Sequence, residues 1–241
     1  MPFETIDPTT EEKLTEFEAL DGADIENVLD RAQAGFETWR HLSMEERADR
    51  LLQLATLIEN GKHAFAKLMT REMGKPIASA VAEAEKCAWV CRFYAEEGAA
   101  HLEPQEFDSN GSKCWVEYQP LGAILAIMPW NFPFWQVIRC AAPALLAGNV
   151  ILLKHAPNVP QCAVAIEGLF ARAGFPEGTF QNVFAEIEDI PQILDSPIVQ
   201  GVSLTGSVRA GSSVAAEAAR RIKTTVLELG GSDPFIVMES A

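Results

Sequence analysis

The stretch that most constrains the fold is residues 119–153, in which Arg139 is the only charged side chain. An apolar stretch of this length could be a membrane span. However, Pro129, Pro133 and Pro143 interrupt it, and a Gly-Asn pair follows at 148–149. These breakers divide it into pieces of strand and helix length. The sequence therefore predicts a buried strand–helix–strand unit, and we expect no membrane association.

The same alternation continues to the end of the chain. The runs "LGAILAIM", "NVILLK", "TFQNVFA", "IVQGVSLT" and "TTVLEL" read as strands, and amphipathic segments over 134–146, 162–173, 189–195 and 208–222 separate them. Continuous apolar strands that alternate with helices are typical of a parallel sheet covered by helices on both faces. We expect an α/β, Rossmann-like core over residues 121–229.

The residues before this core have a different pattern. Ser43 and Glu46 form a capping-box signature that apolar residues follow at helical spacing, and a second helical pattern covers residues 78–100. We therefore expect a helical lead-in over residues 1–104. Asn110-Gly111 predicts a hairpin within 105–120. Residues 230–241 contain another strand-like run, over 234–238.

Composition limits the function classes. The chain has 241 residues, with 19 basic against 34 acidic side chains and a net charge of −15. Such a charge repels nucleic acid and anionic membranes, so we expect neither as a partner. The five cysteines show no metal-ligand spacing, so we expect reduced thiols and no metal site. The N-terminus shows no signal peptide, which favours the cytoplasm.

Ligands of parallel sheets bind where the strands end, so the turns after the strands are the candidate sites. In "MPWNFP", Asn131 precedes a helix, where it could be an N-cap or an amide donor to an oxyanion. In "VILLK", Lys154 could be a solvated strand end or a donor to a ribose or phosphate. In "SLTGSV", Gly206 and Ser207 form an ordinary strand–helix turn or a turn that lets a phosphate approach the backbone.

Taken together, "MPWNFP", "LLK", "LTGS" and "LELGGSDPFIV", in this order and at these intervals, resemble the NAD(P)-dependent aldehyde dehydrogenase superfamily. The segments "LLKHAPNVP", "LTGSVRAG" and "ELGGSDPF" most resemble its succinate-semialdehyde dehydrogenase branch. The resemblance implies oxidation of an aldehyde, succinate semialdehyde above all, with NAD or NADP as cofactor. It also implies a homodimer or homotetramer, formed partly through the 105–120 hairpin.

The resemblance assigns roles to matching positions. Asn131 would hold the oxyanion. Glu228 would activate the water that hydrolyses the thioester, because burial in an apolar run makes a carboxylate more basic. The alternative for Glu228 is an acid paired with a nearby base. Cofactor-binding positions would be Met128, Pro129, Trp130, Lys154, Gly206, Ser207, Leu229 and Gly230.

Three positions bear on specificity. Many NAD-preferring relatives have an acid three residues after the lysine, where this chain has Pro157, so NADP becomes admissible. Phe132 and Arg139 lie on one helix face with Gln136 and are expected to meet the substrate. Arg139 could bind the distal carboxylate of a semialdehyde with its guanidinium fork, or form a structural ion pair.

The nucleophilic cysteine of the family lies beyond the glutamate, and no cysteine of this sequence follows Cys162. The sequence thus resembles the N-terminal, coenzyme-binding half of an aldehyde dehydrogenase, with residues 230–241 as the start of a truncated catalytic domain. The rival interpretation is a non-catalytic nucleotide-binding or structural fragment. A CoA-acylating relative is less consistent with the sequence, because the retained Glu228 favours water as the final nucleophile.

Overall fold

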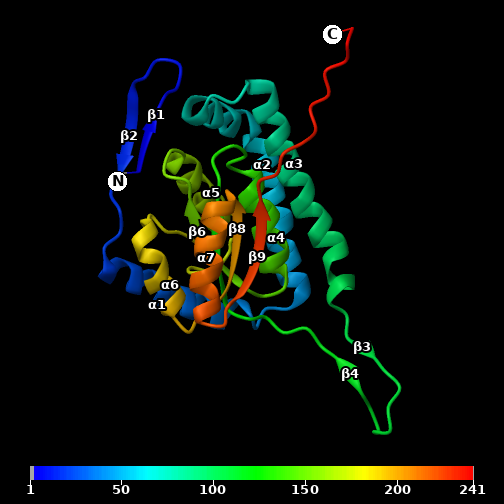
Figure 1. Ribbon diagram of the computed structural model, residues 1–241. Coiled ribbons are helices and arrows are strands. Elements are labelled where there is room, and N and C mark those ends of the chain that lie inside the picture. The colour runs from blue at the N-terminus through cyan, green and yellow to red at the C-terminus, as the bar shows by residue number, and fades with distance from the viewer. Residues whose placement is uncertain (1–2, 241) are drawn as a thin grey trace.

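The computed structural model describes residues 3–240 and has a five-stranded parallel sheet at its centre (Figure 1). The strand order is β7-β6-β5-β8-β9. The bounds are β5 (Ala123–Met128), β6 (Val150–His155), β7 (Phe180–Asn182), β8 (Val199–Gly206) and β9 (Thr224–Leu229). The predicted α/β class with a parallel sheet is confirmed. The order reverses between β5 and β8, and such a switch point is where open sheets of this kind bind ligands.

Helices cover both faces of the sheet. The helices α4 (Trp135–Leu146) and α5 (Pro160–Arg172) pack on one face, and α1 (Gly22–Trp39), α6 (Ile190–Asp195) and α7 (Val208–Arg220) pack on the other. The short 3-10 helix η2 (Ile187–Asp189) leads into α6. Two long helices, α2 (Met44–Met73) and α3 (Ile77–Glu97), form an outer layer over α4 and α5. The 3-10 helix η1 (Gly98–Leu102) follows α3.

The helical lead-in begins later than predicted. Strands β1 (Phe3–Ile6) and β2 (Lys13–Phe17) pair antiparallel and precede α1. The reason is tertiary, because Phe3 packs on Phe184 and the hydroxyl of Thr5 donates to the buried carboxylate of Glu72 at 2.5 Å. Met1, Pro2 and Ala241, which the predicted ranges 1–104 and 230–241 include, lie outside the described residues.

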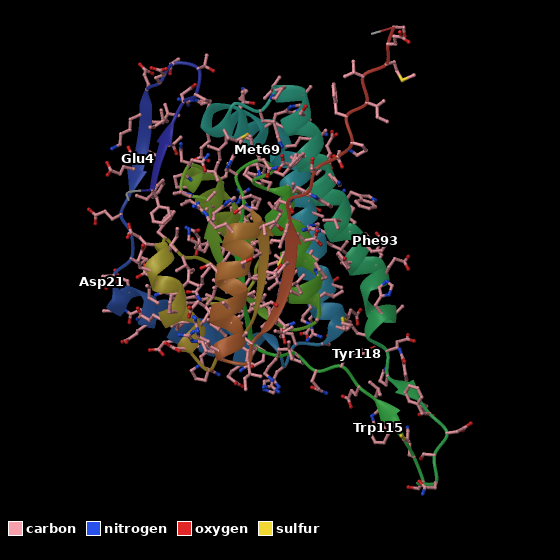
Figure 2. All side chains as sticks on the ribbon, in the orientation of Figure 1. Glu4, Asp21, Met69, Phe93, Trp115 and Tyr118 are labelled. Carbon is pink, nitrogen blue, oxygen red and sulfur yellow. The ribbon has the colours of Figure 1, made fainter. Side chains whose placement is uncertain are left out.

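Two segments project from the layers. Strands β3 (Gln105–Glu106) and β4 (Trp115–Val116) form an antiparallel hairpin within 105–120, and the exposed side chains of Trp115 and Tyr118 extend from it (Figure 2).

The prediction of a strand over 234–238 is wrong. Residues 230–238 form no helix or strand, because no strand among the described residues lies alongside to accept their backbone hydrogen bonds. Within residues 3–240 no helix is long and apolar enough to cross a membrane.

Buried carboxylates of the outer layer cap the helices that follow β5 and β6. Glu83 of α3 accepts hydrogen bonds from the backbone N–H groups of Phe134 and Trp135, both at 2.9 Å, at the start of α4. Glu72 of α2 accepts from Gln161 and Cys162 in the first turn of α5, at 2.7 and 2.8 Å. Each acid satisfies amides that a helix N-terminus leaves without intrahelical partners. These contacts attach the outer layer to the two turns at the sheet's carboxyl edge.

A close backbone contact between α1 and the turn before β7 gives the first prediction. Gly178 has φ +80°, and a Cβ there would lie 2.0 Å from the carbonyl oxygen of Arg31. We expect Gly178→Ala to lower the free energy of unfolding by about 2–4 kcal/mol through strain and overpacking. Gly168→Ala is the matched control, since nothing lies within 4 Å of its Cβ on the exposed side of α5. That change should stabilise the protein by about 0.5–1 kcal/mol in urea unfolding. Equal destabilisation by both changes would contradict the assigned contact.

Candidate active site

The turns that follow β5, β8 and β9 enclose one cavity of about 420 Å³. Its lining residues are Pro129, Trp130 and Asn131 after β5, Thr205 and Gly206 at the end of β8, and Glu228, Leu229 and Gly230 at the end of β9. Seven of these eight positions are sequence-predicted site residues, and Thr205 is the addition. The parallel register explains the gathering, because it brings the carboxyl ends of neighbouring strands to one edge.

A second cavity of about 520 Å³ lies between α7, η2 and the ends of β5, β6 and β8. It contains the predicted residues Lys154 and Ser207. Its wall is largely apolar, with Ile127, Ile187, Ile190, Leu204, Ala210 and Val214, and its remaining polar members are Arg209 and Ser213. Nine of the twelve predicted site residues therefore divide between two cavities, both of which border the switch point between β5 and β8.

Glu228 does not have the buried, apolar environment that the sequence suggested. Its side chain is 55% exposed, and its carboxylate lies 3.5 Å from the guanidinium of Arg139. Strand β9 is at the edge of the sheet, so only β8 adjoins it there. Thus the expected burial is wrong for the described residues, and the alternative of an acid paired with a nearby base is what the structure contains.

Arg139 is the base of that pair. It projects from α4, its Nη2 lies 3.4 Å from the hydroxyl of Thr205, and its buried Nε has no hydrogen-bond partner among the described residues. The ion pair with Glu228 connects α4 to the end of β9, next to the cavity. Gln136, one turn earlier, also has a buried, unpartnered side-chain oxygen.

Asn131 is not a helix cap. The first amides of α4 are accepted by Glu83, and the side chain of Asn131 makes no hydrogen bond within residues 3–240. Its amide therefore remains available at the cavity. Pro133, just beyond it, begins the turn that enters α4, and its carbonyl accepts a hydrogen bond from His155 at 2.9 Å.

Met128 and Phe132, like Arg139, lie beside the cavities without lining them. The side chain of Met128 is buried in the core at the end of β5. The ring of Phe132 is half exposed and lies over the ammonium group of Lys75, 3.6 Å from Nζ to the ring centroid. The structure therefore brings neither side chain into the space that Asn131 and Glu228 share.

Lys154 occupies a partly buried position at the end of β6. Burial lowers the pKa of its ammonium group, while the negative charges of Asp189 and Glu186 raise it. These acids come from the segment between β7 and α6, and neither was among the residues predicted for the site. Arg209 was also missed, although its place in the first turn after "LTGS" could have indicated it.

His155 follows Lys154 and is fully buried. Its Nδ1 accepts from the backbone N–H of Ala156 at 2.8 Å, so Nε2 carries the proton and donates to Pro133. Burial lowers the pKa of this imidazole to about 4, against the opposing effect of the hydrogen bond to Pro133. A neutral histidine thus joins β6 to the turn that carries Asn131.

The five thiols lie elsewhere. Burial raises the pKa of Cys87, Cys140 and Cys162, and raises that of Cys91 to about 12. Cys114 is exposed on the β3–β4 hairpin. No cysteine lines either cavity at the carboxyl edge.

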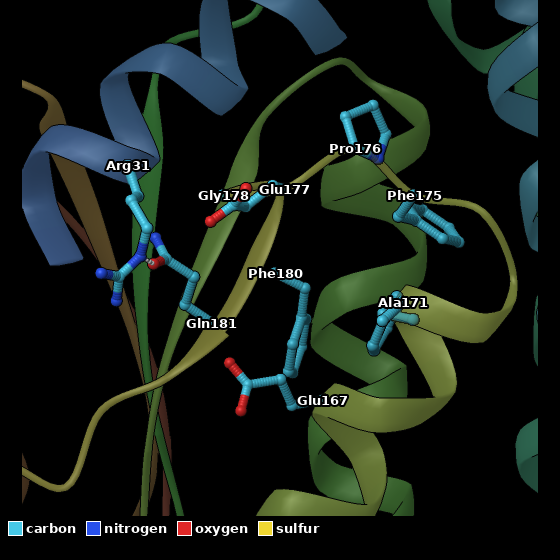
Figure 3. A pocket seen from close by; sticks show the side chains of 10 residues that line it. Arg31, Glu167, Ala171, Phe175, Pro176, Glu177, Gly178, Phe180 and Gln181 are labelled. Atoms are coloured by element: carbon cyan, nitrogen blue, oxygen red, sulfur yellow. Dashed lines mark hydrogen bonds between the residues drawn. The ribbon is translucent and has the colours of Figure 1, made fainter.

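A further cavity, of about 400 Å³, lies at the opposite end of the strands, between α1, α5 and the start of β7 (Figure 3). Arg31 and Gln181 are hydrogen bonded at 2.9 Å across its side, and Glu167 accepts from the backbone of Asn182. None of the sequence-predicted site residues lines it. Arg31, Gln181 and Glu167 thus already have hydrogen-bond partners, so the carboxyl-edge cavities are the better candidates.

The family model "Aldehyde dehydrogenase family" matches residues 1–241. The chain belongs to the aldehyde dehydrogenase family. It is 50% identical over 241 residues to a probable NADP(+) succinate-semialdehyde dehydrogenase of Synechocystis, covering 100% of this chain and 53% of that protein. It is 49% identical over 244 residues to an NADP(+) succinate-semialdehyde dehydrogenase of Mycobacterium leprae, and this match also covers 100% of this chain and 53% of that protein.

A solved aldehyde dehydrogenase gives the structural comparison. The succinic semialdehyde dehydrogenase of Streptococcus pyogenes, in complex with NADP+, superposes with a TM-score of 0.93 at 36% identity. The superposition covers 98% of this chain and 52% of that one. The chain therefore spans about half the length of the relatives that it matches. The resemblance seen in the motifs is confirmed at the level of family and fold.

The buried histidine gives a pH prediction. Because the pKa of His155 is lowered to about 4 in the folded protein, the unfolded chain binds the proton more readily below about pH 6.5. The contribution of the neutral His155 to the free energy of unfolding is therefore fully present above about pH 6.5 and is lost as the pH falls toward 4. Between pH 6.5 and 5 the loss should be about 1.5 kcal/mol.

His155→Gln keeps a donor toward Pro133 but does not titrate, so urea unfolding of this variant should lack that part of the pH dependence. The control is His101→Gln, which changes an exposed histidine on η1 and should leave the pH dependence of stability as in the wild type. Identical pH profiles for wild type and His155→Gln would contradict the assignment.

Proposed function

We propose that this chain supplies the cofactor-binding and water-activating parts of an NAD(P)-dependent aldehyde dehydrogenase that oxidises an aldehyde to its carboxylic acid. One observation carries the proposal. Asn131 and Glu228, an amide donor and a carboxylate from strands that are not adjacent in the sheet, line the same cavity. The cavity that contains Lys154 borders it at the switch point.

Asn131 and Glu228 suit the two successive steps of the reaction, attack on the aldehyde and hydrolysis of the thioester. The free amide of Asn131 can donate to the oxygen of an attacked aldehyde, where a positioned donor stabilises developing negative charge. Glu228 can take a proton from a water molecule as that water attacks a thioester. Its contact with Arg139 holds the carboxylate beside the cavity that both Glu228 and Asn131 line.

The second cavity fits a nicotinamide dinucleotide. Its apolar wall suits the adenine ring, and the ammonium of Lys154 can donate to ribose hydroxyls or a 2′-phosphate. The N-terminus of α7 and Arg209 offer positive potential to phosphate. When bound, the nicotinamide ring accepts the hydride that the aldehyde loses.

We propose that both NAD and NADP are accepted. The position three residues after Lys154 is Pro157, which is exposed and carries no charge. Arg209 adds a cation to the same cavity, while Asp189 and Glu186 add negative charge near Lys154. Two relatives are described as NADP(+) enzymes, and the Streptococcus pyogenes structure contains NADP+.

Succinate semialdehyde is the proposed substrate. The relatives' names support it, and so does Arg139, the only cation of α4, which lies beside the cavity with one nitrogen unpartnered. A carboxylate at the far end of the substrate could bind this guanidinium, which is suited to planar, bidentate partners. The competing role is that Arg139 only holds Glu228.

A homo-oligomer is part of the proposal. The β3–β4 hairpin exposes Phe107, Trp115, Val116 and Tyr118, and such an apolar patch on a projecting ribbon suits pairing with another copy of the protein.

A second candidate function is nucleotide binding without catalysis. One observation favours it: none of the five thiols lines the cavity, whereas aldehyde oxidation of this type requires a thiolate nucleophile. Cofactor binding without any contribution to turnover would distinguish this candidate.

A chimaera tests the enzymatic proposal. Residues 1–241 are joined to the part of the Synechocystis relative that this chain does not match, and NADPH formation from succinate semialdehyde is followed. We expect turnover, and a fall in kcat of about 100-fold or more in Glu228→Gln, because a general base is lost. The control is Glu217→Gln, which changes a half-buried acid of α7 that pairs with Arg220 and Arg221 and lines neither cavity, and it should leave kcat unchanged. A chimaera that binds NADP+ but oxidises no aldehyde would favour the non-catalytic candidate.

The same chimaera tests the role of Arg139. If the guanidinium binds the substrate's carboxylate, Arg139→Leu should raise KM for succinate semialdehyde about tenfold or more, the scale of losing a hydrogen bond to a charged group. Oxidation of an uncharged aldehyde of similar length should be spared. A fall in kcat with both aldehydes would instead assign Arg139 to holding Glu228.

A further inference from the structure

Three consecutive residues after Asn131 are each held by a different buried side chain. The ring of Phe132 lies on the ammonium of Lys75, the carbonyl of Pro133 accepts from His155, and the amide of Phe134 donates to Glu83. The three holding residues come from separate elements, namely the loop after α2, strand β6 and helix α3. We call Lys75, Glu83 and His155 the turn clamp.

The clamp is connected internally. Lys75 and Glu83 form an ion pair whose side chains are 8% and 1% exposed. One carboxylate oxygen of Glu83, Oε2, faces Lys75, while the other, Oε1, accepts from both amides at the start of α4. Each charge is therefore compensated, which a buried ion pair requires if it is not to destabilise the fold. The ammonium also lies against the Phe132 ring, a favourable cation–π arrangement.

Such a network is more than the docking of α4 requires. A single cap would satisfy the helix end, yet the carbonyl, the ring and the amides of adjacent residues are each fixed from a different direction. Asn131 precedes these residues, and its own side chain makes no hydrogen bond within the described residues. The backbone that the clamp holds therefore sets the position of the Asn131 Cα and Cβ atoms, from which the amide reaches the cavity.

We propose that the turn clamp of Lys75, Glu83 and His155 positions the side-chain amide of Asn131 at the cavity, and that these three are positioning residues for oxyanion stabilisation. The inference rests on the proposed function only for the role of Asn131 as an oxyanion donor. Donors of this kind act through preorganisation, and a displacement of about 1 Å can cost about 100-fold in rate. By holding residues 132–134, the clamp fixes the backbone next to Asn131, whose side-chain amide has no hydrogen bond of its own within the described residues.

Two double variants separate capping from charge. In Glu83→Gln with Lys75→Met, the glutamine oxygen can still accept from the amides of Phe134 and Trp135, and no buried charge remains. In Glu83→Leu with Lys75→Met, both amides lose their acceptor. Glu83→Gln alone leaves a buried ammonium facing an amide donor and should be less stable than the glutamine double variant.

The readout is the nitrogen-15 NMR signal of the Asn131 side-chain amide in the full chain, identified by its loss in Asn131→Asp. We expect the signal to be shifted in the leucine double variant and to return to its wild-type position in the glutamine double variant. Exchange of the Trp135 backbone amide should be about tenfold or more faster in the leucine variant only, the scale of one lost charged hydrogen bond.

Glu72→Leu is the matched control, since Glu72 is equally buried and caps α5 instead of α4. It should lower stability in urea while the Asn131 signal stays unchanged. If the leucine double variant does not fold, His155→Leu, which removes only the donor to Pro133, carries the same expectation of a shifted signal.

The proposal is overturned if the Asn131 signal is unmoved in a folded clamp variant, or if Glu72→Leu moves it equally. Titration with NADP+ in the same samples keeps the two hypotheses apart. Failure of the wild-type chain to bind NADP+ would count against the proposed function, whereas the Asn131 signal tests the clamp with or without cofactor.

Discussion

The hydrogen bonds from the start of α4 to the carboxylate of Glu83 are the interaction on which the site depends most. They join the outer helical layer to the first turn after β5, where an apolar core alone would leave donors unsatisfied. Glu72 does the same for α5, after β6. Two buried acids thus attach one helical layer to both turns, and without them that layer would pack through apolar contacts that do not define direction.

The sheet topology then decides what those turns can do. Because the strand order reverses between β5 and β8, the turns after these strands diverge and leave space between them. Asn131 enters that space from one side and Glu228 from the end of β9, while Lys154 lies on the other side of β5. The cavity of Lys154 and the cavity of Asn131 and Glu228 are two parts of one edge, which suits a long ligand with an apolar ring, phosphates and a reactive end.

Sequence alone predicted the features that depend on local order along the chain. Strand ends are visible in the pattern, so Asn131, Lys154 and Gly206 could be placed at one edge, whereas the site role of Glu228 came from the family resemblance. The four sequence motifs also indicated the aldehyde dehydrogenase family. The exposure of Glu228 could not be predicted, because it depends on what covers β9 and not on the apolar run in which the residue lies.

The clamp was missed for a related reason. Glu83 lies 51 residues before the amide of Phe134 that it accepts from, and a glutamate within an alanine-rich helical pattern looks like a solvated face. His155 reads as the residue after a predicted ligand, and its bond to Pro133 appears only in three dimensions. Partners of this kind follow from the packing of layers, for which a single sequence carries no local signal.

Binding of a nicotinamide dinucleotide at the carboxyl edge of the sheet can be measured by backbone hydrogen exchange with and without NADP+. Binding there predicts slower exchange in residues 127–135, 154–159 and 204–214 on addition of NADP+, with residues 175–181 at the opposite cavity unchanged. Slower exchange confined to residues 175–181, or no change anywhere at saturating NADP+, would contradict it.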